Sequence, residues 1–364
     1  MKDRGQKTGT QFLAGLAIGL CYVWLIVDAR AASAASVSAL GLCARVIVPS
    51  LFPFFVCSNL FCALGLERPM ERVLSRVVEP LFGVPGSGAA ALFVGLTGGY
   101  PSGAQSVGAL YGGGSIDRKT AKRLLLFCNN CGPAFIFGVV GPSVFGTSLA
   151  GLLLYLVHVA SSLLLGIFAR KSGHMQERTA QDAENVPSVS FSSALTASVK
   201  KSGQTALEVC MFVVVFGVVT AMVQTALRLV LPDWALVIVS GLLELSGGTS
   251  ALAEAAMPQG VKFALASFFL AFGGLSVHAQ TKAVLSSAGL EGLPVFFPKL
   301  LHALLASILS IPVYALFRAR LEAAQTFLSQ APVLPFAVME LMLCAAICLA
   351  FRKMAGSNLR GDRV

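Results

Sequence analysis

The chain has 364 residues, of which 56% are hydrophobic and only 12% are charged, and its mean hydropathy is +0.79. A soluble domain carries about twice that share of charged residues, so the composition excludes one. The net charge of +10 does not indicate nucleic-acid binding, because the basic residues gather in short clusters between apolar runs, as the positive-inside rule requires. Long runs rich in Leu, Ala, Gly and Val predict an all-α polytopic membrane protein in contact with lipid.

The cysteines and the known catalytic motifs give no sign of redox or enzymatic chemistry. The nine cysteines are odd in number and irregularly spaced, which indicates no disulfide framework. Cys128 and Cys131 have CxxC spacing, but no second pair lies near them, as a zinc site would need. No metalloprotease, nucleophile-elbow or Walker A pattern occurs. We therefore expect no metal, no cofactor and no enzymatic activity.

The N-terminal region predicts a first membrane helix. A basic start precedes the apolar run 12–28, which is long enough to span and places the N-terminus in the cytoplasm. Residues 29–35 look like a signal-peptidase site, so two alternatives stay open, a cleaved signal peptide and an uncleaved helix. The apolar run is longer than a usual signal h-region, which favours the uncleaved helix.

Residues 38–66 predict a second span that Pro49 and Pro53 bend. Arg45 within it either reaches the headgroups by snorkelling or lines the protein core. Residues 67–80 are charged and amphipathic, which is typical of a helix lying in the membrane interface.

Residues 81–114 are dense in glycine around Gly95–Gln105 (GLTGGYPSGAQ). We expect two short half-helices that turn between Thr97 and Ser102. Because basic clusters flank the segment on both sides, it predicts a re-entrant hairpin that enters and leaves on the same side of the membrane. The alternative is an ordinary spanning helix with small residues for close packing.

The rest of the chain predicts a linker, a second half with its own glycine interruption, and a last span. The linker, 170–203, is polar and expected to be flexible and cytoplasmic. The further expected segments are a span 124–142 broken at 129–133, a span 149–169, a span 204–231, a hairpin 234–257 interrupted at Ser246–Ser250, a span 261–286 broken at 272–281, and spans 295–317 and 333–351.

Three landmarks recur at nearly constant offsets, which indicates a duplicated unit. Gly98 corresponds to Gly247 (247 − 98 = 149), Cys131 to Gly273 (273 − 131 = 142), and His158 to His302 (302 − 158 = 144). The expected organisation is an N-terminal helix (1–37), a first repeat (38–169), the linker, an inverted second repeat (204–317) and a C-terminal helix with a basic tail (318–364). Counting about eight spans and two hairpins places both termini in the cytoplasm, although Arg318 and Arg320 then fall outside, against the charge rule.

Interrupted helices at membrane depth are typical of solute sites in transporters. Unwound N–H groups attract anions and unwound C=O groups hold cations, while neutral polar side chains bond a polar solute. Glu244 lies beside the second interruption and is the strongest single candidate; the alternative is a structural pairing with Lys262 or Lys282. The candidate solute-binding residues are Thr97, Ser102, Gln105, Asn129, Asn130, Glu244, Ser246, Thr249, Ser276, His278 and Gln280.

Four motifs resemble the sporulation integral membrane protein family of the YlbJ type. They are Leu51–Phe55, Gly95–Ala104, Cys128–Pro133 and Phe272–Gln280, and the resemblance covers roughly residues 10 to 320. It places the chain with the Gate, or nucleoside-recognition, domain proteins and implies a plasma-membrane protein linked to spore cortex formation. It also implies two inverted repeats with re-entrant hairpins. The hairpin lacks the Thr-Glu that follows Gln in nucleoside transporters, so the resemblance does not extend to nucleoside recognition.

These observations predict a protein that moves a small polar solute or ion across the cell membrane. The alternative is a non-transporting scaffold that assembles with other sporulation membrane proteins or with a second copy of itself. An intramembrane enzyme is disfavoured because no nucleophile or metal set is recognisable. The solute, the coupling ion and the direction of transport do not follow from the sequence.

Overall fold

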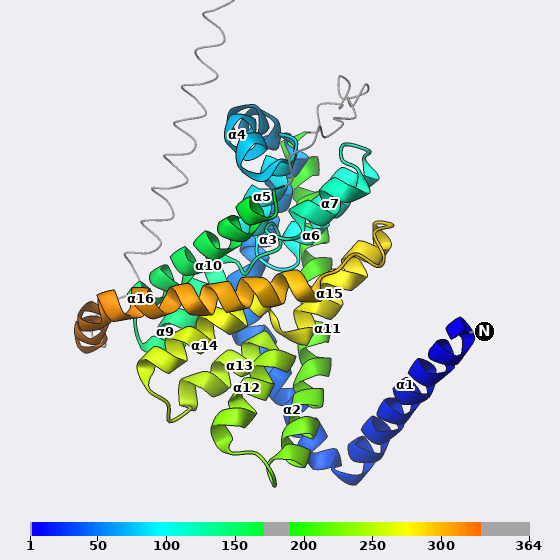
Figure 1. Ribbon diagram of the computed structural model, residues 1–364, viewed down its shortest axis with the longest axis vertical. Coiled ribbons are helices and arrows are strands. Elements are labelled where there is room, and N and C mark those ends of the chain that lie inside the picture. Colours follow the sequence, from blue (N-terminus) through cyan, green and yellow to red (C-terminus); the bar gives the residue numbers. More distant parts are fainter. Residues whose placement is uncertain (1, 171–189, 329–364) are drawn as a thin grey trace, which may run out of the picture. The chain divides into compact units, whose positions relative to one another are not determined.

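A computed structural model describes residues 2–170 and 190–328, and every regular element within these ranges is helical (Figure 1). The predicted all-α class is therefore confirmed. Contacts divide the chain into two units, Met1–Arg318 and Ala319–Val364, and the candidate site described below lies in the first. Most of the predicted linker and the predicted span 333–351 lie outside the described residues.

The N-terminal elements are α1 (Lys2–Val27), α2 (Ala29–Leu42), the π-helical segment η1 (Cys43–Ile47) and α3 (Val48–Ala63). The last three form one continuous helix, so the second span begins at Ala29 rather than at residue 38. Asp28 starts it by accepting a hydrogen bond from the Ala31 amide at 3.3 Å, and the alanines that follow favour helix. The π turn ends just before Pro49, which lacks the N–H that would continue the regular helical bonding.

The glycine-dense segment folds as the sequence predicts. The elements are α4 (Glu67–Phe82), α5 (Gly88–Thr97) and α6 (Ser102–Gly112), and α5 packs against α6. The turn between them uses Gly99 at φ +79° and a cis peptide bond between Tyr100 and Pro101. The expected pair of half-helices turning between Thr97 and Ser102 is therefore confirmed, while its re-entry from one side of the membrane stays a prediction.

The predicted span 124–142 is not one helix. The chain here forms α7 (Arg118–Leu124), α8 (Pro133–Phe135), the π-helical η2 (Ile136–Val140), α9 (Gly141–Phe145) and α10 (Ser148–Phe168). Residues 125–132 are irregular, so the break at Asn129 and Asn130 separates α7 completely from α8. Proline at position 133 explains where helix resumes, because proline is favourable in the first turn. The predicted span 149–169 matches α10.

The second half contains α11 (Phe191–Leu227), α12 (Asp233–Leu243), α13 (Leu245–Glu254), α14 (Gln259–Phe272), α15 (Gly274–Ser287) and α16 (Phe296–Leu328). Two expectations are corrected. Residues 191–203 are helical rather than a flexible linker, because Ser190 caps α11 and Ala194, Ser198 and Ser202 bury one face. The second hairpin breaks at Glu244, and Ser246–Ser250 lie within α13.

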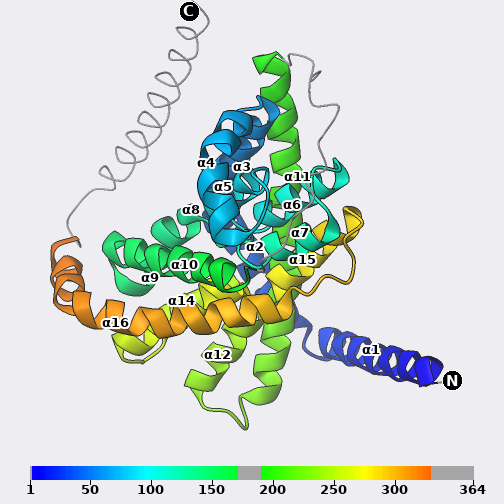
Figure 2. The same cartoon turned by 45° about the horizontal axis from the view of Figure 1, so that its top comes forward.

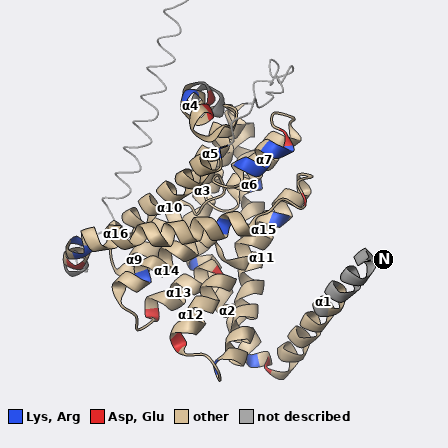
Figure 3. Ribbon diagram, in the orientation of Figure 1, with Lys and Arg blue, Asp and Glu red and all other residues tan. Residues whose placement is uncertain are grey.

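By length and composition, five helical stretches within the described residues could cross a membrane. They are Ala29–Ala63, Ser148–Phe168, Phe191–Leu227, Gln259–Ser287 and Phe296–Ala324. The predicted spans 12–28 and 124–142 correspond to shorter apolar helices, Ala14–Val27 and Pro133–Phe145. Figure 3 shows charged residues on α4 and α7 and none along α10, in keeping with an apolar span.

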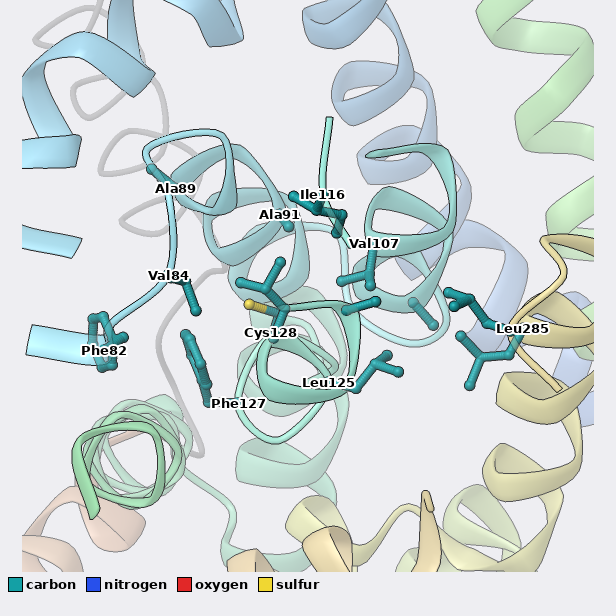
Figure 4. Packing of buried hydrophobic residues seen from close by; sticks show 14 of the residues in the cluster. Phe82, Val84, Ala89, Ala91, Val107, Ile116, Leu125, Phe127, Cys128 and Leu285 are labelled. Carbon is teal, nitrogen blue, oxygen red and sulfur yellow. The ribbon is translucent and has the colours of Figure 1, made fainter. Parts of the chain in front are cut away.

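A hydrophobic core packs the first hairpin against the segment that follows it (Figure 4). Phe82 and Phe127 stack with ring centroids 4.7 Å apart, and Ala91, Val107 and Cys128 are fully buried between the half-helices. Leu285 joins the same cluster from α15. This core fixes the irregular stretch 125–132 against both half-helices of the first hairpin.

Candidate functional site

The four interruptions of the helices meet in the interior of the first unit. They are the turn 98–101, the irregular stretch 125–132, Glu244, and Gly273 between α14 and α15. The packing is reciprocal, because α6 of the first hairpin contacts α15, and α13 of the second hairpin contacts α9. Helices of each half therefore contact the broken helix of the other half.

Tyr100 and Gly274 show how closely these interruptions approach one another. The Tyr100 hydroxyl lies 3.2 Å from the Leu270 carbonyl oxygen and 3.1 Å from that of Ala271, at the end of α14. Gly274 has φ +72°, and a Cβ there would lie 3.1 Å from the Leu243 carbonyl oxygen. Only glycine fits that close backbone approach without strain.

A cavity of about 40 Å³ lies where the interruptions meet. Its polar side chains come from Tyr100, Glu244, Ser246 and Gln280, and apolar residues of η1, α3 and α11 close it. The lining residues are Ile47, Leu51, Tyr100, Cys131, Gly132, Phe135, Val209, Val213, Glu244, Leu245, Ser246, Val277 and Gln280. A single water molecule needs a cavity volume of roughly 10–15 Å³. In this conformation the cavity therefore admits a few waters or an ion and no larger solute.

Glu244 is built into the second break rather than paired with a lysine. It is extended (φ −142°, ψ 124°) and only 4% exposed, and its carboxylate accepts hydrogen bonds from the Ser246 amide at 3.0 Å and the Gly247 amide at 2.5 Å. It thus caps the N-terminus of α13, where the helix dipole favours negative charge. Lys262 instead donates to the Ala253 carbonyl at 2.8 Å.

Asn129 and Lys299 connect the two halves of the chain at the irregular stretch 125–132. The Asn129 side chain donates to the Thr281 hydroxyl at 3.0 Å and accepts from the Ala104 amide at 3.4 Å. Its backbone carbonyl accepts from the Lys299 ammonium at 2.8 Å. Lys299 is 3% exposed and was not among the predicted site residues, although a lysine inside the predicted span 295–317 is a signal for a functional position.

His158 and His302 lie next to each other, with ring centroids 4.7 Å apart and ring planes tilted by 49°. The Lys299 ammonium can only donate, so His302 Nδ1, 2.9 Å away, accepts and Nε2 carries the proton. That Nε2–H reaches the His158 carbonyl at 3.1 Å and the Ser161 hydroxyl at 3.0 Å. His158 Nε2 accepts from the Cys131 amide at 3.1 Å, so it is a packed, hydrogen-bonded histidine.

Of the predicted solute-binding residues, Glu244, Ser246 and Gln280 line the cavity. Ser276 lies behind Gln280 and accepts its hydrogen bond at 3.3 Å. Asn129 lies in the irregular stretch 125–132, close in sequence to the cavity residue Cys131. Their binding role stays a prediction.

The other candidates have structural partners elsewhere. Thr97 donates to the Phe93 carbonyl, Gln105 to the Thr205 hydroxyl, Asn130 to the Phe127 carbonyl and Thr249 to the Ser246 carbonyl, while Ser102 is buried and His278 packs against Phe272 and Phe296. Within the described ranges, no three His, Cys, Asp or Glu residues cluster in a way that could hold a metal ion.

Comparison with known proteins gives one informative match. No protein-family model and no solved structure matches the chain. The chain is similar to the sporulation integral membrane protein YlbJ of Bacillus subtilis (strain 168), with 29% identity over 317 residues that cover 78% of each chain. The motifs and this alignment agree, and together they identify the chain as a relative of the YlbJ-type sporulation integral membrane proteins.

Proposed function

We propose that this protein moves a small polar solute or ion across the cell membrane during spore formation, through the cavity between its broken helices. The observation that carries the proposal is the meeting of four backbone interruptions around one cavity, whose mostly apolar lining includes a few polar side chains. Non-helical backbone at membrane depth is tolerated inside protein or beside water, and in transporters it surrounds the solute. The sporulation context comes from the similarity to YlbJ.

The cavity's size and chemistry narrow the proposed cargo. About 40 Å³ is too small for a nucleoside, so a larger solute would require the cavity to open. Glu244 supplies a carboxylate, and Ser246 and Gln280 supply neutral donors and acceptors. An inorganic ion or a solute of a few heavy atoms fits this set best.

The test uses two glutamines that differ in position. Gln280 lines the cavity, whereas Gln105 is directed toward α11, where it bonds Thr205 at 3.2 Å. Gln280→Ala, Gln105→Ala and Glu244→Gln are expressed in a Bacillus subtilis strain lacking YlbJ, in which the wild-type chain is first shown to restore sporulation. Heat-resistant spores are counted, and the amount of each variant in the membrane is measured.

We expect Gln280→Ala and Glu244→Gln to lower spore counts at least about tenfold at normal protein levels, and Gln105→Ala to leave them within about twofold. If all three variants sporulate normally, the cavity is not used for transport and the protein acts as a membrane scaffold. Equal losses for the two glutamines would also count against the cavity, because they would show a general packing defect.

A further inference from the structure

Lys299 lies in an unusual position for a cation. It is the fourth residue of α16, close to the helix N-terminus, where the helix dipole disfavours positive charge. It is also 3% exposed, and a buried charge is costly unless compensated. A set of acceptors is therefore needed for the side chain to remain an ammonium at this place.

Three acceptors surround its three N–H groups. The Asn129 carbonyl oxygen lies 2.8 Å from Nζ, His302 Nδ1 lies 2.9 Å from it, and the centroid of the Tyr100 ring lies 5.1 Å away. The last distance is within cation–π range. The ammonium therefore faces two hydrogen-bond acceptors and the face of an aromatic ring.

The acceptors are held in place independently of the lysine. Asn129 lies in the irregular stretch before α8, and its side chain is fixed by Thr281 and the Ala104 amide. His302 is oriented by the Ser161 hydroxyl, and Tyr100 by carbonyls of α14. Carbonyls exposed where a helix is unwound are the groups that coordinate Na⁺ in transporters with broken helices.

We propose that the Lys299 ammonium is a tethered cation, which occupies a monovalent-cation site formed by the Asn129 carbonyl, His302 Nδ1 and the Tyr100 ring. The wild-type protein then needs no metal ion at this place. Removal of the lysine side chain creates a binding site for Na⁺, K⁺ or a small alkylammonium ion. The proposal does not depend on transport, because it concerns the stability of the folded chain.

The first repeat carries no cation at the related position. At the offset of the histidine pair, Lys299 corresponds to Tyr155 (299 − 144 = 155), whose hydroxyl donates to the Leu96 carbonyl at 3.1 Å. A neutral donor thus reaches a backbone carbonyl in one repeat, and an ammonium does so in the other. The predicted second repeat therefore carries a lysine where the predicted first repeat carries a neutral hydroxyl.

Lys262 is a matched control within the same chain. It is also buried, at 6% exposure, and its ammonium donates to one backbone carbonyl, that of Ala253. No imidazole or aromatic ring accompanies it in the contacts that the structure shows. Its removal leaves one carbonyl rather than a set of acceptors, so it should not create a cation site.

The experiment follows thermal unfolding of the purified full-length protein in detergent. Wild type, Lys299→Ala, Lys299→Ser and Lys262→Ala are purified and unfolded in choline, sodium, potassium or methylammonium chloride at one ionic strength. We expect the wild-type Tm to be the same in all four salts. Lys299→Ala should unfold at a lower temperature in choline and recover by at least about 3 °C in methylammonium or an alkali cation, saturably. Lys262→Ala should show no such recovery.

Three results would overturn the proposal. The first is a wild-type Tm that rises with sodium or potassium, and the second is a Lys299→Ala Tm that is equal in all four salts. The third concerns Lys299→Ala or Lys299→Ser protein that does not fold in choline chloride. The proposal then predicts that folded variant is recovered from membranes only in sodium, potassium or methylammonium chloride. Failure to recover it in every salt would contradict the proposal, because no free cation would replace the side chain.

Discussion

The two helical hairpins solve the same problem by opposite means. In the first, the turn between α5 and α6 is made by the backbone, with Gly99 in the left-handed region, and both half-helices pack directly on the Cys128 backbone. In the second, the break between α12 and α13 is made by a side chain, the Glu244 carboxylate that caps α13. The first break depends on the absence of side-chain atoms and the second on the presence of a charged group.

This difference gives the two hairpins different chemistry. The first hairpin contributes Tyr100 and backbone to the interior, whereas the second contributes a carboxylate to the cavity. Substitutions that add side-chain atoms should therefore destabilise the first hairpin, and substitutions that remove side-chain atoms should destabilise the second. The following substitutions test that contrast.

The largest effect is expected from Gly95→Ala in the first hairpin. A Cβ at Gly95 would overlap the Cys128 carbonyl oxygen, and a Cβ at Gly103 meets the same atom from the other half-helix. Because backbone on both sides is fixed, we expect a loss of about 3 kcal/mol or more, seen as loss of folded protein in the membrane. Gly112→Ala is the control, since nothing lies within 4 Å of its Cβ position. Equal yields of the two variants would contradict the contrast.

A smaller loss is expected from Glu244→Ala in the second hairpin. It leaves the Ser246 and Gly247 amides without their acceptor, and the loss of such a helix cap costs about 0.5–2 kcal/mol. Glu244→Gln keeps one oxygen and should lose roughly half as much Tm in thermal unfolding. Glu254→Ala, at the exposed end of the same helix, serves as the control. A Glu244→Ala protein as stable as this control would show that the carboxylate does not hold the break.

The smallest effect concerns Asp117, an exposed carboxylate that caps α7 as Glu244 caps α13. The Thr120 hydroxyl, at 2.6 Å, and the Thr120 amide, at 2.8 Å, donate to it and lower its pKa below the usual value, with help from Lys119 and Arg123. A lowered folded pKa gives stability that is present above the unfolded pKa of about 3.9 and is lost as the pH falls through the folded value.

Because Asp117 is exposed, we expect no more than about 1 kcal/mol from it. Tm measured downward from about pH 6 should fall less steeply for Asp117→Asn than for the wild type. If Tm falls equally steeply with pH in the two proteins, the Asp117 cap does not contribute to the loss of stability in acid.

The sequence by itself determined the features that local chemistry controls. The helical class follows from long apolar runs, the turn near Gly99 from paired glycines and a proline, and the break at Gly273 from a second glycine pair. The sequence also predicts a duplicated unit, and the two histidines that its offset relates, His158 and His302, lie next to each other in the structure. These features can be predicted without knowing the distant contacts, because backbone freedom and hydropathy depend on the residue types at adjacent positions.

Only the tertiary structure decided which polar residues share the interior. Glycines at 247 and 248 suggested a break, yet both lie in a helix, where Gly248 packs closely on Gly241. The break lies instead at Glu244, whose carboxylate caps that helix. Gln105 and Gln280 look alike in sequence, but only Gln280 faces the cavity. The sequence did not predict a role for Lys299, because its acceptor at Asn129 lies 170 residues away in the chain. Its other acceptor, His302, lies three residues away. A buried charge is positioned by partners that only the folded chain brings together, so its role does not follow from its neighbours in sequence.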